Sequence, residues 1–372
     1  MANDTDTAAG EALCWRDQAL AALDEGNPSR ALSIAGQALG TLEAAGLRGG
    51  LDEAAVLVAV AEIEEALGRF ADAGGTIGAA VGILEDCAAE YADDDSLLLW
   101  CQAQERQAGL ERMAGDFTGA AARLNVVLDR ASASLGEASL AVVSAANALG
   151  IVYKYASDLD AATAAYGRAA AALARLADPD PLLEAGLLHN LGGLAHSRGD
   201  PGAGIPLAER GVTLRAEALG PGHPDVARDM NALGALYQLA GRHADAERSY
   251  RSALAVFEDA YGPDHFETAM TLANLAVLHS DDGDFAQAES LGRRCLKIFT
   301  AVLGPDDAEV GLTLLNLAAA VAGRGRTAEA AELAARAAAI LTDRVPPGHP
   351  HLLAAADALG QYSQPRDSGQ PG

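Results

Sequence analysis

The hydrophobic pattern of the chain repeats at a constant interval. Leucines lie 42 residues apart at Leu191, Leu233, Leu275, Leu317 and Leu359. Prolines keep the same interval at Pro221, Pro263, Pro305 and Pro347. A period of this length is typical of repeat proteins, in which each unit buries its apolar face against its neighbours. The pattern therefore predicts one extended array of repeats in place of several unrelated domains.

A turn residue marks the middle of each predicted repeat. A residue without Cβ closes the link between two antiparallel helices at low cost. The turn residues are Gly26, Gly68, Gly115, Ser157, Gly199, Gly241, Gly283 and Gly325. They predict eight helical hairpins, with a solvated loop in or near "DCAAEYADDDSLL" where the spacing is longer. The segment "HLLAAADALGQY" resembles the first helix of another pair and is predicted to cap the array.

Small residues recur at two fixed places around each turn. Seven positions before the turn stand Ala19, Ala61, Ala108, Gly150, Gly192, Gly234, Ala276 and Ala318. Five positions after it stand Ala31, Ala73, Ala120, Ala162, Gly204, Ala246, Ala288 and Ala330. Because helices approach closely only over small side chains, these positions are predicted to be the crossing points within each pair.

Composition agrees with an all-α fold. Half of the residues are hydrophobic and only 4% are aromatic, and no alternating β-branched runs of strand length occur. Residues 9–135 are predicted to form divergent repeats, and residues 136–362 regular repeats with the capping helix. Residues 1–8 and 363–372 hold little that could be buried and are expected to be disordered.

These features resemble a known family. The motif combines Leu233-Gly234 or Leu191-Gly192, an aromatic residue at Tyr153 or Tyr237, the turn glycine, and Ala246, Tyr250 and Ala253 after it. It is similar to the tetratricopeptide repeat. The 42-residue period and the "LGPGHPDV" link resemble the longer variant of kinesin light chains and bacterial relatives. The resemblance implies a right-handed superhelical solenoid of about eight antiparallel helix pairs plus a C-terminal capping helix.

Charge restricts the class of partner. The chain has a formal charge of −26, from 26 basic and 52 acidic side chains. Such a charge repels the phosphates of nucleic acids and anionic membranes, which proteins bind through basic side chains. We therefore expect neither DNA, RNA nor a membrane as partner. A solvated acidic outer face is the favoured explanation of this charge, and a groove for a basic ligand is the alternative.

The cysteines and the N-terminus bear on localisation. Cys14, Cys87, Cys101 and Cys295 have no spacing typical of a metal site or a redox pair, so free and mostly buried thiols are expected. The N-terminus has neither a basic nor an apolar signal region. A cytoplasmic protein is predicted.

The chain shows no recognisable catalytic motif. Equivalent places in the links between repeats are occupied by His223, His265, Asp307 and His349. Their side chains are predicted to bind exposed backbone groups before the next helix. They are too far apart to share a metal ion. No cofactor is expected, and the protein is predicted not to be an enzyme. A hidden enzyme around residues 87–112 would need a pocket with a perturbed titratable group.

The resemblance points to polar residues on the first helix of each repeat as a binding face. In the family, that helix lines a concave groove for an extended peptide, and asparagines there grip the peptide backbone. The residues at these places are Asn147, Asn190, Asn231, Asn274 and Asn316, together with Lys154, His196 and Gln238 farther along the same helices at another inner register. Ala232 interrupts the series. Equally, the asparagines could bond to the neighbouring helix and only rigidify the stack.

The predicted function is therefore that of a non-catalytic scaffold, which binds a peptide-like segment of another protein in this groove. A signal-responsive regulator is the alternative. In that case a small peptide would change the shape of the superhelix, and the output would come from an effector in trans.

Overall fold

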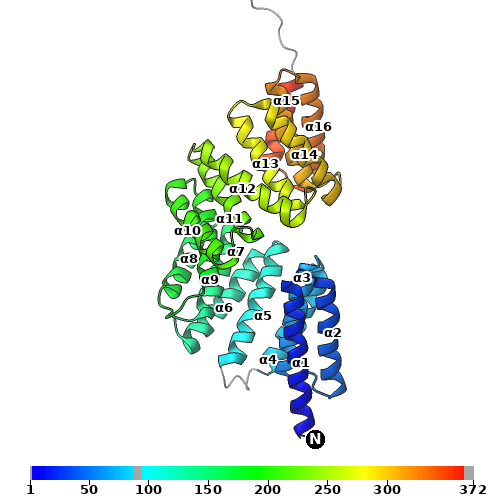
Figure 1. The fold of residues 1–372 in the computed structure, drawn as a ribbon, viewed down its shortest axis with the longest axis vertical. Coiled ribbons are helices and arrows are strands. Elements are labelled where there is room, and N and C mark those ends of the chain that lie inside the picture. The colour runs from blue at the N-terminus through cyan, green and yellow to red at the C-terminus, as the bar shows by residue number, and fades with distance from the viewer. Residues whose placement is uncertain (1, 88–93, 364–372) are drawn as a thin grey trace, which may run out of the picture. The chain divides into compact units, whose positions relative to one another are not determined.

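The computed structural model describes residues 2–87 and 94–363, and every regular element in these ranges is an α-helix. The all-α prediction is confirmed. The chain forms two compact units, Met1–Pro179 and Asp180–Gly372, whose helices are drawn in Figure 1. The boundary between the two units, at residues 179 and 180, lies about one repeat after the predicted change from divergent to regular repeats at residues 135 and 136.

Unit 1 contains four helix pairs in the residues described. Their bounds are α1 Ala2–Asp24, α2 Pro28–Ala44, α3 Leu51–Ala66, α4 Phe70–Asp86, α5 Asp94–Met113, α6 Phe117–Leu135, α7 Leu140–Tyr155 and α8 Leu159–Leu173. Residues 88–93 of the predicted loop "DCAAEYADDDSLL" lie outside the described residues, whereas Asp94 and Asp95, predicted to belong to the loop, form the first turn of α5.

Unit 2 contains four further pairs and one last helix. Their bounds are α9 Pro181–Ser197, α10 Pro201–Leu219, α11 Pro224–Leu239, α12 His243–Tyr261, α13 Phe266–Asp281, α14 Phe285–Leu303, α15 Ala308–Gly323, α16 Thr327–Arg344 and α17 Pro350–Ser363. Helix α17 packs on α15 and α16 and so covers the last pair, as predicted for the capping helix. The tail beyond Ser363 lies outside the described residues.

All eight predicted turn residues lie between the helices of a pair and have positive φ. The seven glycines adopt this conformation without steric cost. Ser157 is the one non-glycine residue with positive φ in the described part of the chain, at 62°. The backbone therefore explains why glycine recurs at this place.

Each unit is a stack in which odd-numbered helices form one row. Every odd-numbered helix contacts its own partner and the next odd-numbered helix of its unit. Within either unit, no two even-numbered helices of the described chain make comparable contacts. The surface lined by the odd-numbered helices, here called the odd-helix face, is therefore a continuous feature of each unit, as in a superhelical solenoid.

The links between pairs are built as predicted. The side chains of His223, His265 and Asp307 are the N-caps of α11, α13 and α15, where each accepts a hydrogen bond from the backbone N–H two residues later at 2.9–3.2 Å. Pro224 begins α11, where its missing N–H costs nothing. The structure describes no cluster of His, Cys, Asp or Glu residues that could hold a metal ion.

Two of the predicted crossing points accommodate a tyrosine ring. A Cβ atom on Gly150 would lie 2.4 Å from Cε1 of Tyr166, and one on Gly234 would lie 2.6 Å from Cε1 of Tyr250. Both tyrosines are fully buried. All sixteen predicted crossing residues are buried as well. Glycine is therefore required where the partner helix carries an aromatic side chain.

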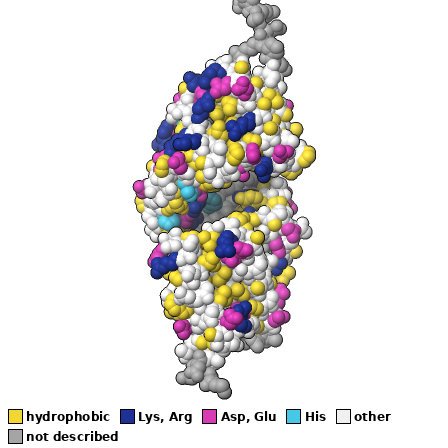
Figure 2. Space-filling view, turned by 90° about the vertical axis from the view of Figure 1, so that its right-hand side faces the viewer, with side chains coloured by type: hydrophobic (Ala, Val, Ile, Leu, Met, Phe, Trp, Pro, Cys, Tyr) yellow, Lys and Arg dark blue, Asp and Glu magenta, His cyan; other side chains and the backbone are white. Residues whose placement is uncertain are grey.

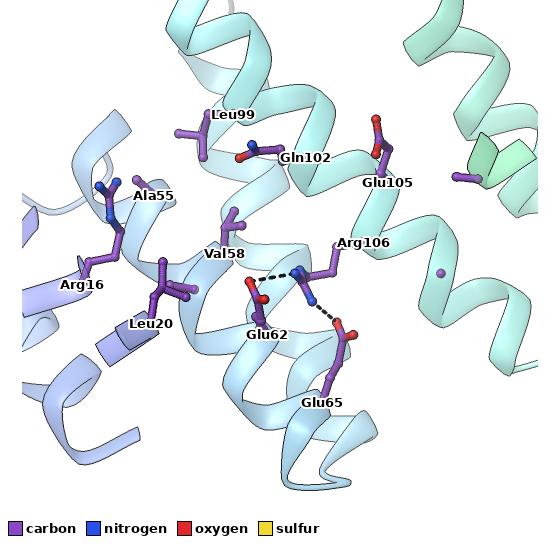
Figure 3. Close-up of a pocket in the computed structure, with 13 residues that line it drawn as sticks. Arg16, Leu20, Ala55, Val58, Glu62, Glu65, Leu99, Gln102, Glu105 and Arg106 are labelled. Carbon is purple, nitrogen blue, oxygen red and sulfur yellow. Dashed lines mark ion pairs between the residues drawn. The ribbon is translucent and has the colours of Figure 1, made fainter. Parts of the chain in front are cut away.

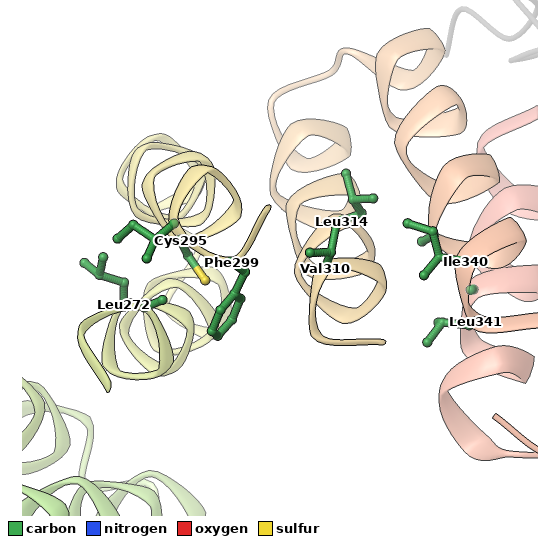
Figure 4. Close-up of a cluster of buried hydrophobic side chains, with 11 residues drawn as sticks. Leu272, Cys295, Phe299, Val310, Leu314, Ile340 and Leu341 are labelled. Atoms are coloured by element: carbon green, nitrogen blue, oxygen red, sulfur yellow. The ribbon is translucent and has the colours of Figure 1, made fainter. Parts of the chain in front are cut away.

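A cluster of buried apolar side chains joins successive pairs of unit 2. Leu272, Phe299, Leu314 and Leu341 come from α13, α14, α15 and α16, and all are 1% exposed or less (Figure 4). Each such side chain contributes about 1.5–3 kcal/mol relative to an exposed one. The stack is therefore held by the contact of each pair with the next.

The N-terminal boundary differs from the prediction, because α1 begins at Ala2 although residues 1–8 were expected to be disordered. The helix is packed from Ala12 onward, and lengthening an existing helix costs much less than starting one. All four cysteines are free thiols, and Cys101 and Cys295 are buried. No helix in the described chain combines the length and apolar character needed to cross a bilayer.

Candidate functional site

The structure places the predicted binding residues on the odd-helix faces, but it engages several of them in internal contacts. Asn147 and Lys154 lie on α7 of unit 1, and the other six lie on α9, α11, α13 and α15 of unit 2. Asn316 and His196 are exposed, whereas the remaining six are half-buried. Two of the eight residues therefore belong to unit 1 and six to unit 2.

Two of the asparagines bind each other. Asn274 on α13 donates a hydrogen bond to Oδ1 of Asn231 on α11, at 3.2 Å. Asn147 and Asn190 also interact with other groups of the protein. The pairing of Asn231 with Asn274 is what the rigid-stack alternative requires.

The residues farther along the same helices have different surroundings. Gln238 donates to Asp281 on α13 at 2.7 Å and accepts from the Tyr250 hydroxyl of α12 at 3.1 Å. Burial and the nearby Arg112 guanidinium lower the pKa of Lys154. Gln238 therefore joins three helices, whereas Lys154 is a cation in an unfavourable environment.

Only a small cavity accompanies the exposed Asn316. It holds about 10 Å³ and is lined by Ala273, Ala276, Ala288, Gly292, Thr313, Asn316 and Leu317. That space admits at most one water molecule.

A much larger hollow lies on the odd-helix face of unit 1. It has a volume of about 680 Å³ and opens to solvent (Figure 3). Its apolar wall is formed by Leu20, Ala55, Val58, Ala59, Leu99, Gly109 and Ala148, and its polar groups are Arg16, Glu62, Glu65, Gln102, Glu105 and Arg106. These residues come from α1, α3, α5 and α7. An apolar wall with a few polar groups is typical of ligand sites.

Arg106 is the centre of the polar contacts in the hollow. Its guanidinium lies 2.9 Å from Glu62 and 3.1 Å from Glu65, both on α3. Figure 3 shows the Arg106 side chain reaching from α5 toward these two carboxylates. The two pairs hold α5 against α3 at the edge of the hollow.

Glu105 precedes Arg106 in the chain and makes a contact with another helix. Its carboxylate accepts a hydrogen bond from the Ser144 hydroxyl of α7. Burial raises the pKa of Glu105 to about 7, and the Ser144 hydrogen bond opposes this rise. The hollow therefore contains a carboxyl group that changes charge near neutral pH.

The sequence offered a signal for these residues that the prediction did not use. Asn147 and Asn231 stand ten positions before their turn residues, and Glu105 stands ten before Gly115. The same place in the first repeat is Arg16, and Arg106 takes the place of Asn190. The positions predicted to bind a ligand in the regular repeats therefore correspond, in the divergent repeats, to charged residues of the hollow, namely Arg16, Glu105 and Arg106.

Ion pairs occur over much of the surface. On the face shown in Figure 2, basic and acidic side chains lie next to one another in both units. Examples are Arg228 with Glu267 at 2.8 Å and Arg294 with Glu258 at 2.6 Å. Many basic side chains are thus paired with acidic ones, while the net charge of −26 is unchanged.

Comparison with known proteins supports the repeat architecture. Three overlapping stretches, residues 183–259, 240–301 and 267–343, match a family model described as tetratricopeptide repeat. No curated protein matches the chain. The solved structure of BtubC (BKLC) from P. vanneervenii is 22% identical, with a TM-score of 0.53, over 61% of this chain and 92% of that one.

Two further solved structures resemble most of the chain. A Rap protein complexed with Competence and Sporulation Factor is 14% identical, with a TM-score of 0.57, over 84% of this chain and 87% of that one. A signal transduction ATPase with a tetratricopeptide repeat sensor, from Pyrococcus horikoshii, is 15% identical, with a TM-score of 0.61, over 84% of this chain and 44% of that one. Identities this low show a shared fold.

Proposed function

We propose that this chain, whose residues 183–343 match the tetratricopeptide repeat, acts as a protein-interaction scaffold or regulator and binds a peptide-like segment of a partner protein in the hollow of unit 1. The observation that carries this proposal is the hollow itself. The hollow has a volume of about 680 Å³. It lies on the odd-helix face, which corresponds to the face that binds peptides in the family that the sequence resembles. A cleft of 300–1,000 Å³ is of the size that buries a few side chains of a ligand.

The chemistry of the wall suits a peptide. Leu20, Val58 and Leu99 offer apolar contact, and the exposed amide of Gln102 can both donate and accept hydrogen bonds. A peptide backbone needs both kinds of group. The exposed Asn316 and His196 of unit 2 are proposed as additional contacts on the odd-helix face of that unit.

The role is proposed to be non-catalytic. Catalysis would require a nucleophile, a base and a stabilising group for developing charge, all converging on one point. The wall of the hollow contains carboxylates, guanidiniums, one amide and apolar groups, without a hydroxyl, thiol or imidazole among the described lining residues. Glu105 provides a titratable group, but such a wall is better suited to recognition.

A photo-crosslinking experiment tests the site. A benzoylphenylalanine residue in place of Gln102, on the wall of the hollow, is expected to capture one defined segment of a partner in lysate of the source cells. The control places the same group at Gln37, which is exposed on α2 and outside the hollow. Mass spectrometry identifies the crosslinked peptides. Identical peptides from both positions, or none from Gln102, would contradict the proposal.

The similarity to the Rap protein complexed with Competence and Sporulation Factor favours a regulator as the second candidate. Here the bound segment would change the shape of the stack. Small-angle scattering with and without the captured segment separates the two roles. A scaffold keeps its radius of gyration, whereas a regulator changes it.

A further inference from the structure

The two arginines of the hollow already have counter-charges. Arg106 pairs with Glu62 and Glu65 on α3. Arg16 is bound by its neighbour Asp17, with N–O distances of 2.7 and 2.9 Å. Neither guanidinium is therefore available to balance another carboxylate without losing a contact it already makes.

Glu105 has no such partner. Its one hydrogen bond comes from the uncharged Ser144 hydroxyl, and the described part of the chain offers it no ion pair. A carboxylate can accept about four hydrogen bonds. In Figure 3 the Glu105 side chain points away from Glu62 and Glu65, whereas Arg106 points toward them. Among the described residues, one carboxylate of the hollow thus lacks a counter-charge.

We infer that Glu105 is the counter-charge for a lysine or arginine side chain of the bound segment. The inference rests on the proposed function and names the chemistry of its ligand. Leu20, Val58 and Leu99 of the hollow can receive the methylene stem of such a side chain, since long basic side chains bury their stems against apolar surface. The charged end would then lie beside the Glu105 carboxylate, which forms no ion pair with any described residue.

The titration of Glu105 fixes the conditions under which this contact forms. The charged and titratable groups near Glu105 are Arg106 and the buried Cys101 on the same helix, Glu62 and Glu65 on α3, and Arg16 on α1. Helix α7 contributes the uncharged Ser144 hydroxyl, which contacts Glu105 but does not line the hollow. With a pKa of about 7, caused mainly by burial, the Glu105 carboxyl is largely ionised at pH 8 and largely protonated at pH 6. Cation binding should therefore strengthen as the pH rises through 7.

Pools of seven-residue peptides provide a probe that does not require the natural sequence. The central residue is fixed as lysine, arginine, glutamine or glutamate, and the others are randomised. Each pool is passed over immobilised protein at pH 8. Wild type is expected to retain the lysine and arginine pools about fivefold more than the glutamine pool. This ratio should fall to about one in Glu105→Gln.

Two further variants sharpen the test. Glu105→Lys should reverse the preference toward the glutamate pool, while Glu11→Gln, an exposed carboxylate outside the hollow on α1, should leave the ratios unchanged. Circular dichroism confirms that each variant is folded. Gln102→Trp, which fills the hollow, should reduce retention of every pool, and Gln37→Trp should not.

The outcomes separate this inference from the proposed function. Equal retention of the lysine and glutamine pools by wild type, with loss in Gln102→Trp, would overturn the role of Glu105 and leave peptide binding in the hollow intact. Retention that is unaffected by Gln102→Trp, or no retention of any pool, would overturn both. A lysine preference that persists in Glu105→Gln would place the counter-charge on another residue and so refute the inference.

Discussion

Asn274 of α13 donates a hydrogen bond to Oδ1 of Asn231 on α11, at 3.2 Å, so two side chains predicted to hold a ligand hold each other. Asn274→Ala and Asn231→Ala are each expected to lower the free energy of unfolding by about 1 kcal/mol. The double variant should cost less than the sum, because the second substitution removes no further bond. Urea denaturation of the four proteins measures this coupling.

Asn316→Ala is the matched control for that cycle. Asn316 is exposed on α15, so its replacement should change the free energy of unfolding by no more than a few tenths of a kcal/mol. Strictly additive effects of Asn231→Ala and Asn274→Ala would show that the bond contributes nothing to the stack.

The stability of the protein should depend on pH through Glu105. Burial raises its pKa from an ordinary value near 4.5 to about 7, so the folded state holds a proton that the unfolded state releases. Stability from this group is present below pH 4.5 and is lost as the pH rises through 7. Glu105→Gln should therefore be more stable than wild type by about 2–3 kcal/mol at pH 8 and nearly equal at pH 5. Urea midpoints at the two pH values test this, with Glu11→Gln as the unaffected control.

Glu289 joins two repeats of unit 2 and should contribute to stability with the opposite pH dependence. Its carboxylate on α14 is 7% exposed and accepts hydrogen bonds from Arg326, Arg293 and Arg324, which lower its pKa to about 2. Stability from this group is present above pH 4.5 and is lost as the pH falls toward 2. Because the arginines are half-exposed, Glu289→Gln should cost only about 1–2 kcal/mol at pH 7.

The Glu289 prediction is checked by thermal unfolding at pH 7 and pH 3. The gap between wild type and Glu289→Gln should narrow at the lower pH. Glu332→Gln, also in unit 2, serves as the comparison, since Glu332 is exposed and forms no ion pair within residues 2–87 and 94–363. A gap that widens at pH 3 would be incompatible with the stated cause.

Gly234→Ala should destabilise unit 2 by about 2–3 kcal/mol, because the added methyl would lie 2.6 Å from the buried Tyr250 ring. Gly186→Ala on α9 is the control. A methyl there meets no atom within 4 Å, so the variant should gain about 0.5–1 kcal/mol from the restricted unfolded chain. Calorimetry of the two variants, expected to shift in opposite directions, decides whether close approach is the cause.

Ser157→Gly should stabilise the turn between α7 and α8. Ser157 has φ of 62°, a conformation that costs about 1–2 kcal/mol for a residue with Cβ. The reverse exchange, Gly199→Ser, lies at the same place in the next repeat and should destabilise by a similar amount. A fall in the melting temperature of Ser157→Gly would mean that the serine side chain makes a compensating contact.

Much of the fold could be predicted from the sequence because single residues imposed it locally. A turn with positive φ selects glycine, and so Gly241 or Gly283 revealed the period. The caps His223 and His265 were predictable for the same reason, since their bonds reach only two residues along the chain. The length of α1 was not predictable, because it depends on packing that begins only at Ala12.

The candidate site was harder to predict because its contacts cross between repeats. Glu105 and Ser144 are joined although they are far apart in the chain, and Arg106 reaches back to Glu62 in the same way. Such pairs depend on how far each odd-numbered helix is displaced along its neighbour, a quantity that the 42-residue period leaves open. The register that contains Glu105 and Arg106 was visible, but their partners were not.

The matched fit of Gly234 with Tyr250 has a consequence for how such an array can grow. The next pair carries Ala276 and Gly292 at the same places. A hybrid pair that combined the helix containing Ala276 with the helix containing Tyr250 would bring the alanine methyl group into contact with the tyrosine ring. Duplication or recombination that moves both helices together preserves the match, whereas a crossover inside the turn at Gly241 breaks it. The heritable module of this chain therefore runs from one proline-containing link to the next.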